Sequence, residues 1–190
     1  MMITNIFLLI CAGVFVYIRF IQKDDMMATA MKLGAFYPPA IVEDHQYWRF
    51  ITCHFIHVEI FHFLMNAYAF YQLGRFFEAL LGSVCYLFLI LVSMLLSSLL
   101  CYSASQISSR YYYTMTIGAS GVVYGFFGAI SALGYLVGGP FMSLLESFAY
   151  VILINLAYTL FDRQISKTGH LGGLIGGIVA IVILLALRIV

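Results

Sequence analysis

The sequence contains few charged residues. Only 9% of its 190 residues are Asp, Glu, Lys or Arg, whereas 64% are hydrophobic. A soluble domain carries about 25% charged residues, and about half of its residues are apolar. A soluble protein of this size cannot bury so much apolar surface in its core. The scarcity of charge therefore excludes a soluble fold and indicates that the chain is embedded in lipid.

The sequence also lacks the features of several other classes of protein. The net charge is only +1, and the basic residues form no cluster, so no nucleic-acid partner is expected. The four cysteines have no CxxC spacing and are interpreted as small buried apolar residues rather than ligands. Strands of about ten residues with alternating polarity are also missing, so we expect helices in the membrane.

Six apolar segments are long enough to cross a bilayer, which takes about 20 residues each. The first of them has no clear small-residue cleavage site after it and is expected to be retained. A long connection, 21–60, follows the first segment, and a Ser- and Tyr-rich connection, 103–116, follows the third. We predict an all-α polytopic membrane protein, with residues 1–190 forming one domain whose spans cover 3–20, 61–81, 84–102, 117–137, 141–160 and 169–188.

Polar side chains stand near the start of each even-numbered span. His62 and Asn66 lie in the second span, Ser120 in the fourth and His170 in the sixth. Such residues are costly in lipid and mark functional sites by default. Spans two, four and six run in the same direction, so their first residues reach the same side of the membrane at similar depth. The sequence thus predicts that these four side chains meet in one layer.

Glycine spacing predicts how the helices that carry these residues meet. Gly121 and Gly125 follow Ser120, and Gly173 and Gly177 follow His170, in two small-xxx-small patterns that let helices approach closely. Gly134, further along the fourth span, is expected to tolerate alanine.

A serine close to a histidine predicts nucleophilic catalysis. Ser120 would be the nucleophile and His170 the general base that activates it. His62, Asn66 and the backbone N–H of Ser120 are candidate donors to the oxyanion. No carboxylate lies in this layer, so we expect a dyad, with Tyr124 packed against the His170 ring.

The motifs around these residues resemble those of the rhomboid family of intramembrane serine proteases. Their order along the chain matches too: Trp48-Arg49, His62-x3-Asn66, Glu78 with Gly82, Gly118-Ala119-Ser120-Gly121, and His170-x2-Gly173-x3-Gly177. The resemblance implies a six-helix bundle that cleaves transmembrane protein substrates in the lipid bilayer without a cofactor or metal. It also implies a Ser120–His170 dyad, an oxyanion hole at His62 and Asn66, a helical hairpin in the long first connection, and a gate and cap formed by span five and loop 161–168.

Three other functions remain open from the sequence. A catalytically inactive rhomboid relative would bind membrane clients, although such proteins lose the serine or histidine and this chain keeps both. A zinc site could involve His54, His57 and His62 with Glu59, but the spacing from His57 to His62 does not fit HExxH. A transporter would place its polar layer near the midplane of the bilayer.

Orientation has two alternatives. The family resemblance puts the starts of spans two, four and six outside, in what we expect to be a bacterial plasma membrane. The positive-inside rule favours the reverse. The larger number of basic residues falls on the side where these spans start: Lys23, Lys32, Arg49, Arg110, Arg163 and Lys167, against Arg75 and Arg188 on the other side.

Overall fold

The computed structural model describes residues 1–22, 25–162 and 165–189. Regular structure in these ranges is helical, apart from an isolated antiparallel bridge between Phe36 and Thr116. The elements are α1 (Met2–Val16), π-helix η1 (Tyr17–Ile21), α2 (Met26–Leu33), α3 (Pro38–Val42), α4 (Arg49–Thr52), 3-10 helix η2 (Cys53–Phe55), α5 (Ile60–Ile107), α6 (Ser109–Tyr112), α7 (Ser120–Val137), α8 (Pro140–Phe161) and α9 (Lys167–Ala186).

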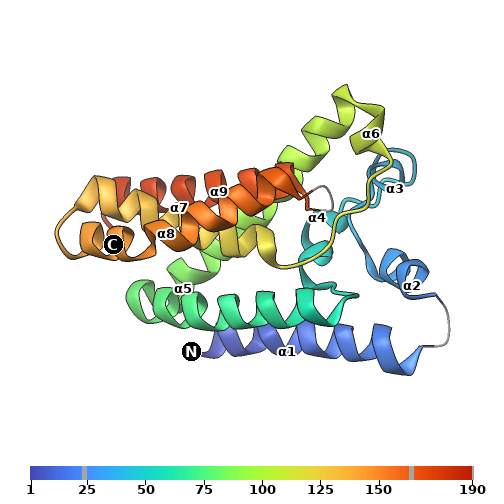
Figure 1. Cartoon of the computed structure of the whole chain (residues 1–190), viewed down its shortest axis with the longest axis horizontal. Helices are drawn as coiled ribbons and strands as arrows, with labels where there is room; N and C mark the ends of the chain where they lie inside the picture. Colours follow the sequence, from blue (N-terminus) through green and yellow to red (C-terminus); the bar gives the residue numbers. More distant parts are fainter. Residues whose placement is uncertain (23–24, 163–164, 190) are drawn as a thin grey trace.

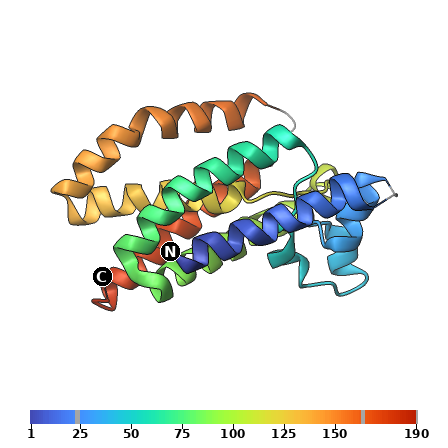
Figure 2. The same cartoon turned by 90° about the horizontal axis from the view of Figure 1, so that it is seen from below.

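Five helices in the described ranges are long and apolar enough to cross a membrane. They are α1 with its extension η1, α5, α7, α8 and α9, and they make the protein the predicted all-α membrane bundle. Helix α5 has 48 residues and breaks at Gly82, whose φ of 73° is accessible to glycine at little cost. The chain folds back there into two arms, 60–81 and 83–107 (Figures 1 and 2). Each arm corresponds to one predicted span, and the count of six crossings stays a prediction.

Several predicted boundaries differ from the observed ones. The connection predicted at 103–116 is wrong in its first part, because the helix continues to Ile107. Polar residues do not end it, since Ser105 Oγ donates to the Tyr102 carbonyl within the helix. Helix α7 begins at Ser120 rather than at 117, and α9 begins at Lys167, where the Ser166 side chain accepts from the Gly169 N–H.

The long connection 21–60 is divided among α2, α3, α4 and η2, which gather at one end of the bundle (Figure 1). Buried Arg49 fastens this region, because its guanidinium donates to the carbonyl of Ala35 at 2.6 Å and to Gln46 Oε1 at 2.8 Å. It also lies 4.9 Å from the centre of the Trp48 ring. The Trp48 ring in turn packs on Gly34, where a Cβ atom would lie 2.2 Å from it. The Trp48-Arg49 pair therefore holds α2 against α4.

Glycines allow α9 to pack closely on α7 and on the second arm of α5. A Cβ atom at Gly173 would lie 1.9 Å from the Gly121 carbonyl oxygen, and one at Gly177 would lie 1.7 Å from that of Gly125. On its other side, a Cβ atom at Gly172 would lie 2.4 Å from the Leu96 carbonyl oxygen. These contacts are with backbone, which cannot rotate away, so α9 needs glycine on both faces.

Gly134 was expected to tolerate alanine, and that expectation is wrong. A Cβ atom there would lie 2.8 Å from Cδ2 and 2.9 Å from Cβ of Leu145 on α8. Gly13 on α1 has no atom within 4 Å of an added Cβ and is the better control position.

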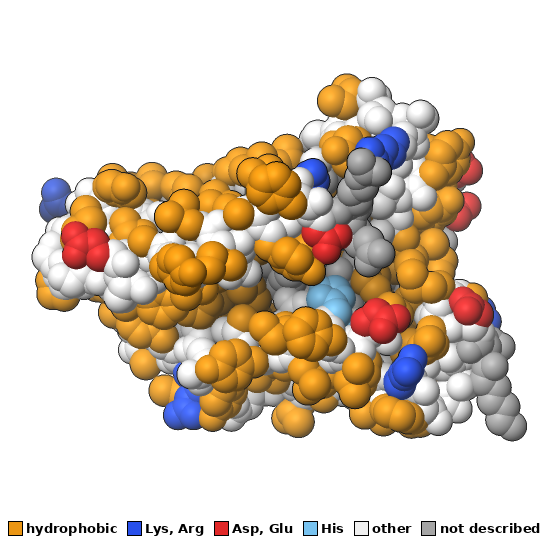
Figure 3. Space-filling view, viewed as in Figure 1, with side chains coloured by type: hydrophobic (Ala, Val, Ile, Leu, Met, Phe, Trp, Pro, Cys, Tyr) orange, Lys and Arg blue, Asp and Glu red, His pale blue; other side chains and the backbone are white. Residues whose placement is uncertain are grey.

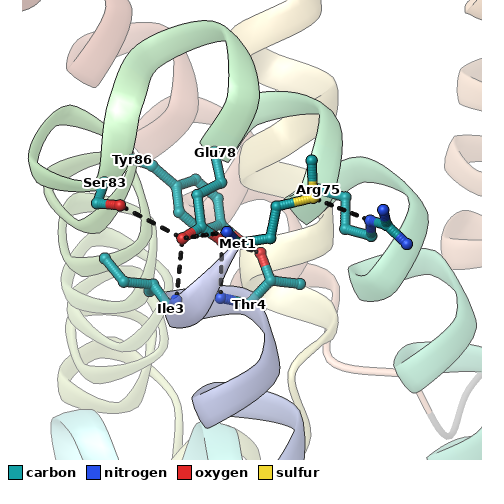
Figure 4. Close-up of polar contacts among 7 residues, drawn as sticks. All are labelled: Met1, Ile3, Thr4, Arg75, Glu78, Ser83 and Tyr86. Carbon is teal, nitrogen blue, oxygen red and sulfur yellow. Dashed lines mark hydrogen bonds and ion pairs between the residues drawn. The ribbon is translucent and has the colours of Figure 1, made fainter.

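A buried carboxylate joins the first arm of α5 to the start of α1. Glu78 accepts from the backbone N–H groups of Ile3 and Thr4, each at 3.0 Å, and from the Thr4 hydroxyl at 2.7 Å (Figure 4). Ser83 donates to the same carboxylate at 3.4 Å, and the Thr4 hydroxyl also contacts Tyr86 at 3.1 Å. Because free N–H groups at a helix start favour negative charge, Glu78 acts as the cap of α1.

Helix α8 lies at an edge of the bundle (Figure 2). Ile152 and Thr159 are its only buried residues, whereas α7 is buried along most of its length. Hydrophobic side chains cover most of the face seen in Figure 3, as expected for contact with lipid. Of the loop 161–168, which was predicted to act as a cap, residues 163 and 164 lie outside the described ranges.

Candidate active site

The structure brings Ser120 and His170 into direct contact. Ser120 is the first residue of α7, and His170 lies in the first turn of α9. The Nε2 atom of His170 lies 2.8 Å from the Ser120 Oγ atom, a hydrogen-bond distance. The His170 side chain is buried, with 9% of its surface exposed.

A strained turn presents Ser120. Gly118 has a φ of 110°, and a Cβ atom at this position would lie 2.6 Å from the His62 ring. The N–H of Gly118 donates to the Cys53 carbonyl at 2.9 Å, and the N–H of Ala119 donates to His57 Nε2 at 3.2 Å. The glycine before Ser120 is thus required both by its backbone conformation and by the imidazole that packs on it.

His62 and Asn66 lie next to this turn. The His62 ring contacts Gly118, two residues before Ser120, and packs against the His57 ring with centroids 5.1 Å apart. Asn66 is buried, and its Nδ2 atom donates to the His62 carbonyl at 2.9 Å. It lines a small cavity with Ala119 and His57 rather than the one that Ser120 lines. His62 thus contacts the Ser120 turn at Gly118, and Asn66 shares a pocket with Ala119 of the same turn.

Away from Ser120, the His170 ring contacts Tyr124 on α7 and Thr159 on α8. The Tyr124 ring stacks on the His170 ring, with centroids 4.0 Å apart and an angle of 19° between the planes. The Nδ1 atom of His170 lies 2.8 Å from the hydroxyl oxygen of Thr159. Thr159 was not among the predicted site residues, because a hydroxyl in an apolar helix is most often a packing residue and carries no motif.

Two further histidines support the site from the connection before α5. Burial lowers the pKa of His54 from 6.5 to about 4, and burial together with the neighbouring His62 lowers the pKa of His57 to about 3. Both rings are therefore neutral at pH 7. His57 can then accept from Ala119, and His54 Nε2 lies 3.1 Å from the Met94 carbonyl oxygen and from the Ser98 hydroxyl. Within the described ranges, no group of three His, Cys, Asp or Glu side chains is arranged to hold a metal ion.

The space beside Ser120 is small. The cavity that Ser120 and His170 line, together with His54, Gly118 and Gly121, has a volume of about 10 Å³. That volume is at the lower limit for one water molecule. Above it, Figure 3 shows a hollow between α8 and the first arm of α5, with a histidine side chain at its floor. A peptide segment could reach Ser120 only after the surrounding helices move apart.

Known proteins are similar in sequence to most of this chain. Rhomboid protease GlpG from Haemophilus influenzae is 28% identical over 186 residues, which are 93% of this chain and 88% of that protein. Rhomboid protease GluP from Bacillus subtilis is 29% identical over 142 residues, or 74% of this chain and 27% of GluP. RHOMBOID-like protein 1 from Arabidopsis thaliana is 29% identical over 152 residues, or 78% of this chain and 37% of that protein.

The chain thus spans well under half the length of the Bacillus and Arabidopsis relatives and most of the length of the Haemophilus one. The rhomboid domain matches residues 44–187, which include every one of the polar residues that meet at the starts of α5, α7 and α9. Because this match covers more than half of the sequence, the chain belongs to the rhomboid family.

Proposed function

We propose that the chain is an intramembrane serine endopeptidase that cleaves the transmembrane segments of membrane proteins. The observation that carries the proposal is the 2.8 Å hydrogen bond between Ser120 Oγ and His170 Nε2 in a buried part of the bundle. A serine hydroxyl is a weak nucleophile until an adjacent base accepts its proton. The names of the bacterial relatives, which are rhomboid proteases, support the same reaction.

In this mechanism Ser120 Oγ attacks the carbonyl carbon of the scissile peptide bond while His170 Nε2 takes the hydroxyl proton. His170 then gives the proton to the leaving amine, and an acyl-enzyme remains on Ser120. A water molecule, activated by His170, hydrolyses the ester and releases the second product. The reaction needs no cofactor or metal ion.

Donors near Ser120 would stabilise the oxyanion that forms in both steps. The first backbone N–H groups of a helix have no partner within it, so the N–H of Ser120 at the start of α7 is available. The His62 ring beside Gly118 is a second donor. Asn66 uses one amide hydrogen for the His62 carbonyl and has another to donate.

The glycines of the motifs have supporting roles. Gly118 makes room for His62, and Gly121 makes room for Ser97 on α5. Gly173 and Gly177 let α9 approach α7 until Ser120 and His170 touch. Residues 1–190 would act as one membrane domain with six crossings in a bacterial plasma membrane, its site opening to the outside. The bacterial setting rests on the Haemophilus relative, of which the chain covers 88%.

The test is cleavage of a fluorescent transmembrane reporter by the purified protein in liposomes. We expect wild type to produce two fragments, and the Ser120→Ala variant, of equal thermal stability, to produce none. Chelators should not change the rate. If wild type binds the reporter without cleaving it, the chain is an inactive rhomboid relative that binds membrane clients, and the proposal is wrong.

A further inference from the structure

Thr159 links the edge helix α8 to the histidine of the site. Its side chain is one of two on α8 that are buried, with 5% of its surface exposed. Its hydroxyl oxygen lies 2.8 Å from Nδ1 of His170, on the opposite side of the ring from Ser120. A threonine on a helix that buries only one other residue is thus directed at the base of the proposed reaction.

The Thr159 hydroxyl belongs to a longer series of hydrogen bonds. The Tyr124 hydroxyl contacts Thr159 Oγ1 and also donates to the backbone carbonyl of Asn155, one turn earlier on α8, at 2.6 Å. Three contacts therefore run in sequence from His170 Nδ1 through Thr159 and Tyr124 to the Asn155 carbonyl. They join residues of α9, α8 and α7.

The number of hydroxyl protons determines which atom donates in each of these three hydrogen bonds. A carbonyl oxygen can only accept, so Tyr124 must give its single proton to Asn155. The Tyr124 oxygen then accepts the proton of Thr159, and the Thr159 oxygen accepts from His170. Only a proton on Nδ1 of His170 satisfies all three contacts.

The other tautomer leaves one contact without a hydrogen. With the ring proton on Nε2, Thr159 has to donate to Nδ1, and the single proton of Tyr124 must serve both Thr159 and Asn155. Two oxygen atoms would then stand at hydrogen-bond distance with nothing between them. Two buried oxygen atoms are rarely found this close without a shared hydrogen, because burial removes the water that would otherwise bind them and the loss of free energy is not offset.

We propose that Thr159 is a positioning residue that, through Tyr124 and the Asn155 carbonyl, holds neutral His170 with its proton on Nδ1. The lone pair of Nε2 then faces Ser120 and can accept its proton as the Oγ–carbon bond forms, while the proton on Nδ1 stays in place. A hydroxyl from α8 would thus do the orienting that a carboxylate does in a Ser-His-Asp triad. The inference rests on the proposed function, since it concerns the base of that reaction.

Four variants test it in the full-length protein: Thr159→Val, Thr159→Ser, Tyr124→Phe and, as a control on α8, Ser147→Ala. Valine keeps the shape of threonine without the hydroxyl, whereas serine keeps the hydroxyl. Ser147 is exposed and bonds only to the Leu144 carbonyl of its own helix. The rate of labelling of Ser120 by a small fluorophosphonate probe measures activation of the serine, and ¹⁵N NMR of labelled histidine, assigned with His170→Ala, reports the tautomer.

We expect Thr159→Val to label about 10- to 100-fold more slowly. This loss is smaller than most general-base effects, which are about 100- to 10,000-fold, because the base itself remains. Its reporter cleavage should show a lower kcat with KM unchanged, because Thr159 touches the base and not the substrate. The NMR signals should show the proton distributed over both ring nitrogens. Thr159→Ser, which keeps the hydroxyl that contacts His170, and Ser147→Ala, which lies on the exposed side of α8, should each label within about twofold of wild type.

Two results separate failure of this inference from failure of the proposed function. If wild type itself is not labelled at Ser120, the proposed function is wrong. If wild type is labelled and Thr159→Val keeps both its rate and its Nδ1 proton, only the positioning role of Thr159 is overturned. Should Thr159→Val not fold, Tyr124→Phe decides, because it frees Thr159 to donate to Nδ1; an unchanged tautomer and rate in that variant would overturn the inference.

Discussion

At the scale of single residues, the site depends on groups that hold Ser120 and His170 rather than on these two alone. The Ser120 turn is fixed by a histidine that accepts from Ala119 and by a glycine at positive φ. His170 is enclosed by an aromatic ring on one face and a hydroxyl at Nδ1. Small shifts of about 1 Å can cost on the order of a hundredfold in rate, so these contacts matter as much as the reacting atoms.

Acidification should destabilise the protein through His57 and His54. Their pKa values in the fold are about 3 and about 4, below the ordinary 6.5. Between these values the unfolded chain binds protons that the folded chain does not, so stability falls as the pH drops below 6.5. The slope is about 1.4 kcal/mol per pH unit for each histidine. Thermal unfolding in detergent between pH 7.5 and 4.5 should show the falling Tm.

The His57→Gln variant should lose part of this pH dependence, because glutamine can accept from Ala119 without titrating. His45→Asn serves as its control, since His45 is exposed and asparagine tolerates its φ of 56°. An equal fall of Tm with pH in wild type and His57→Gln would contradict this account of His57.

The sequence predicts Ser120, His170 and His62 because each stands in a spaced motif with a distinct chemical role. It does not predict Thr159, since one hydroxyl in an apolar helix has no pattern that separates it from a packing residue. The register that turns Thr159 toward His170 depends on how α8 packs, and this is a property of the three-dimensional fold. The same holds for the Asn66 amide, which donates to its own helix.

At the scale of helices, backbone contact between α7 and α9 determines whether the two residues meet. Gly173→Val should push the helices apart, because a Cβ atom at Gly173 would lie 1.9 Å from the Gly121 carbonyl oxygen. Overpacking costs about 1–3 kcal/mol, and the resulting displacement should remove most activity. Reporter cleavage and thermal unfolding measure both losses.

Gly13→Ala on α1 is the control for this experiment, since nothing lies within 4 Å of the added atom. It should keep the activity of wild type. Full activity in Gly173→Val would mean that α7 and α9 do not meet as described.

The capping of α1 by Glu78 gives a second prediction at this scale. In Glu78→Ala the N–H groups of Ile3 and Thr4 lose their buried acceptor, at a cost of about 1–3 kcal/mol. Tm should therefore fall by several degrees, while Ser120 is still labelled by a fluorophosphonate below that temperature. Ser83→Ala, which removes only the 3.4 Å contact, should change Tm little, and an equal fall in both variants would contradict the capping role.

The helices themselves could largely be predicted from apolar segments of the right length. The largest error in a boundary lies where polar residues do not end a helix. Ser105 bonds to its own helix, so a Ser-rich stretch read as a connection is helical as far as Ile107. The reversal at Gly82 falls between the predicted spans 61–81 and 84–102, so the sequence did predict this break within α5.

At the scale of the whole molecule, the question is how a peptide would reach Ser120. The cavity beside Ser120 has a volume of about 10 Å³, so the proposed cleavage requires it to widen before a peptide can bind. Helix α8 is the best candidate to move, because it buries only Ile152 and Thr159. Segments with few buried contacts open most readily.

Hydrogen exchange followed by mass spectrometry can check this order of stability. In detergent, peptides from α8 should exchange faster than peptides from α7 and α9, which pack on each other along their glycines. Equal protection of all three helices would show that α8 is not the element that opens.

The central claim is that Ser120 is a nucleophile activated by His170. The most direct measurement is mass-spectrometric mapping of a fluorophosphonate adduct on wild type, Ser120→Ala, His170→Ala and the double variant, each shown to be folded by its Tm. The account predicts one adduct, on Ser120 of wild type, and none in the three variants, because residues that act as a unit do not contribute additively. An adduct on another residue, or undiminished labelling of Ser120 in His170→Ala, would contradict it.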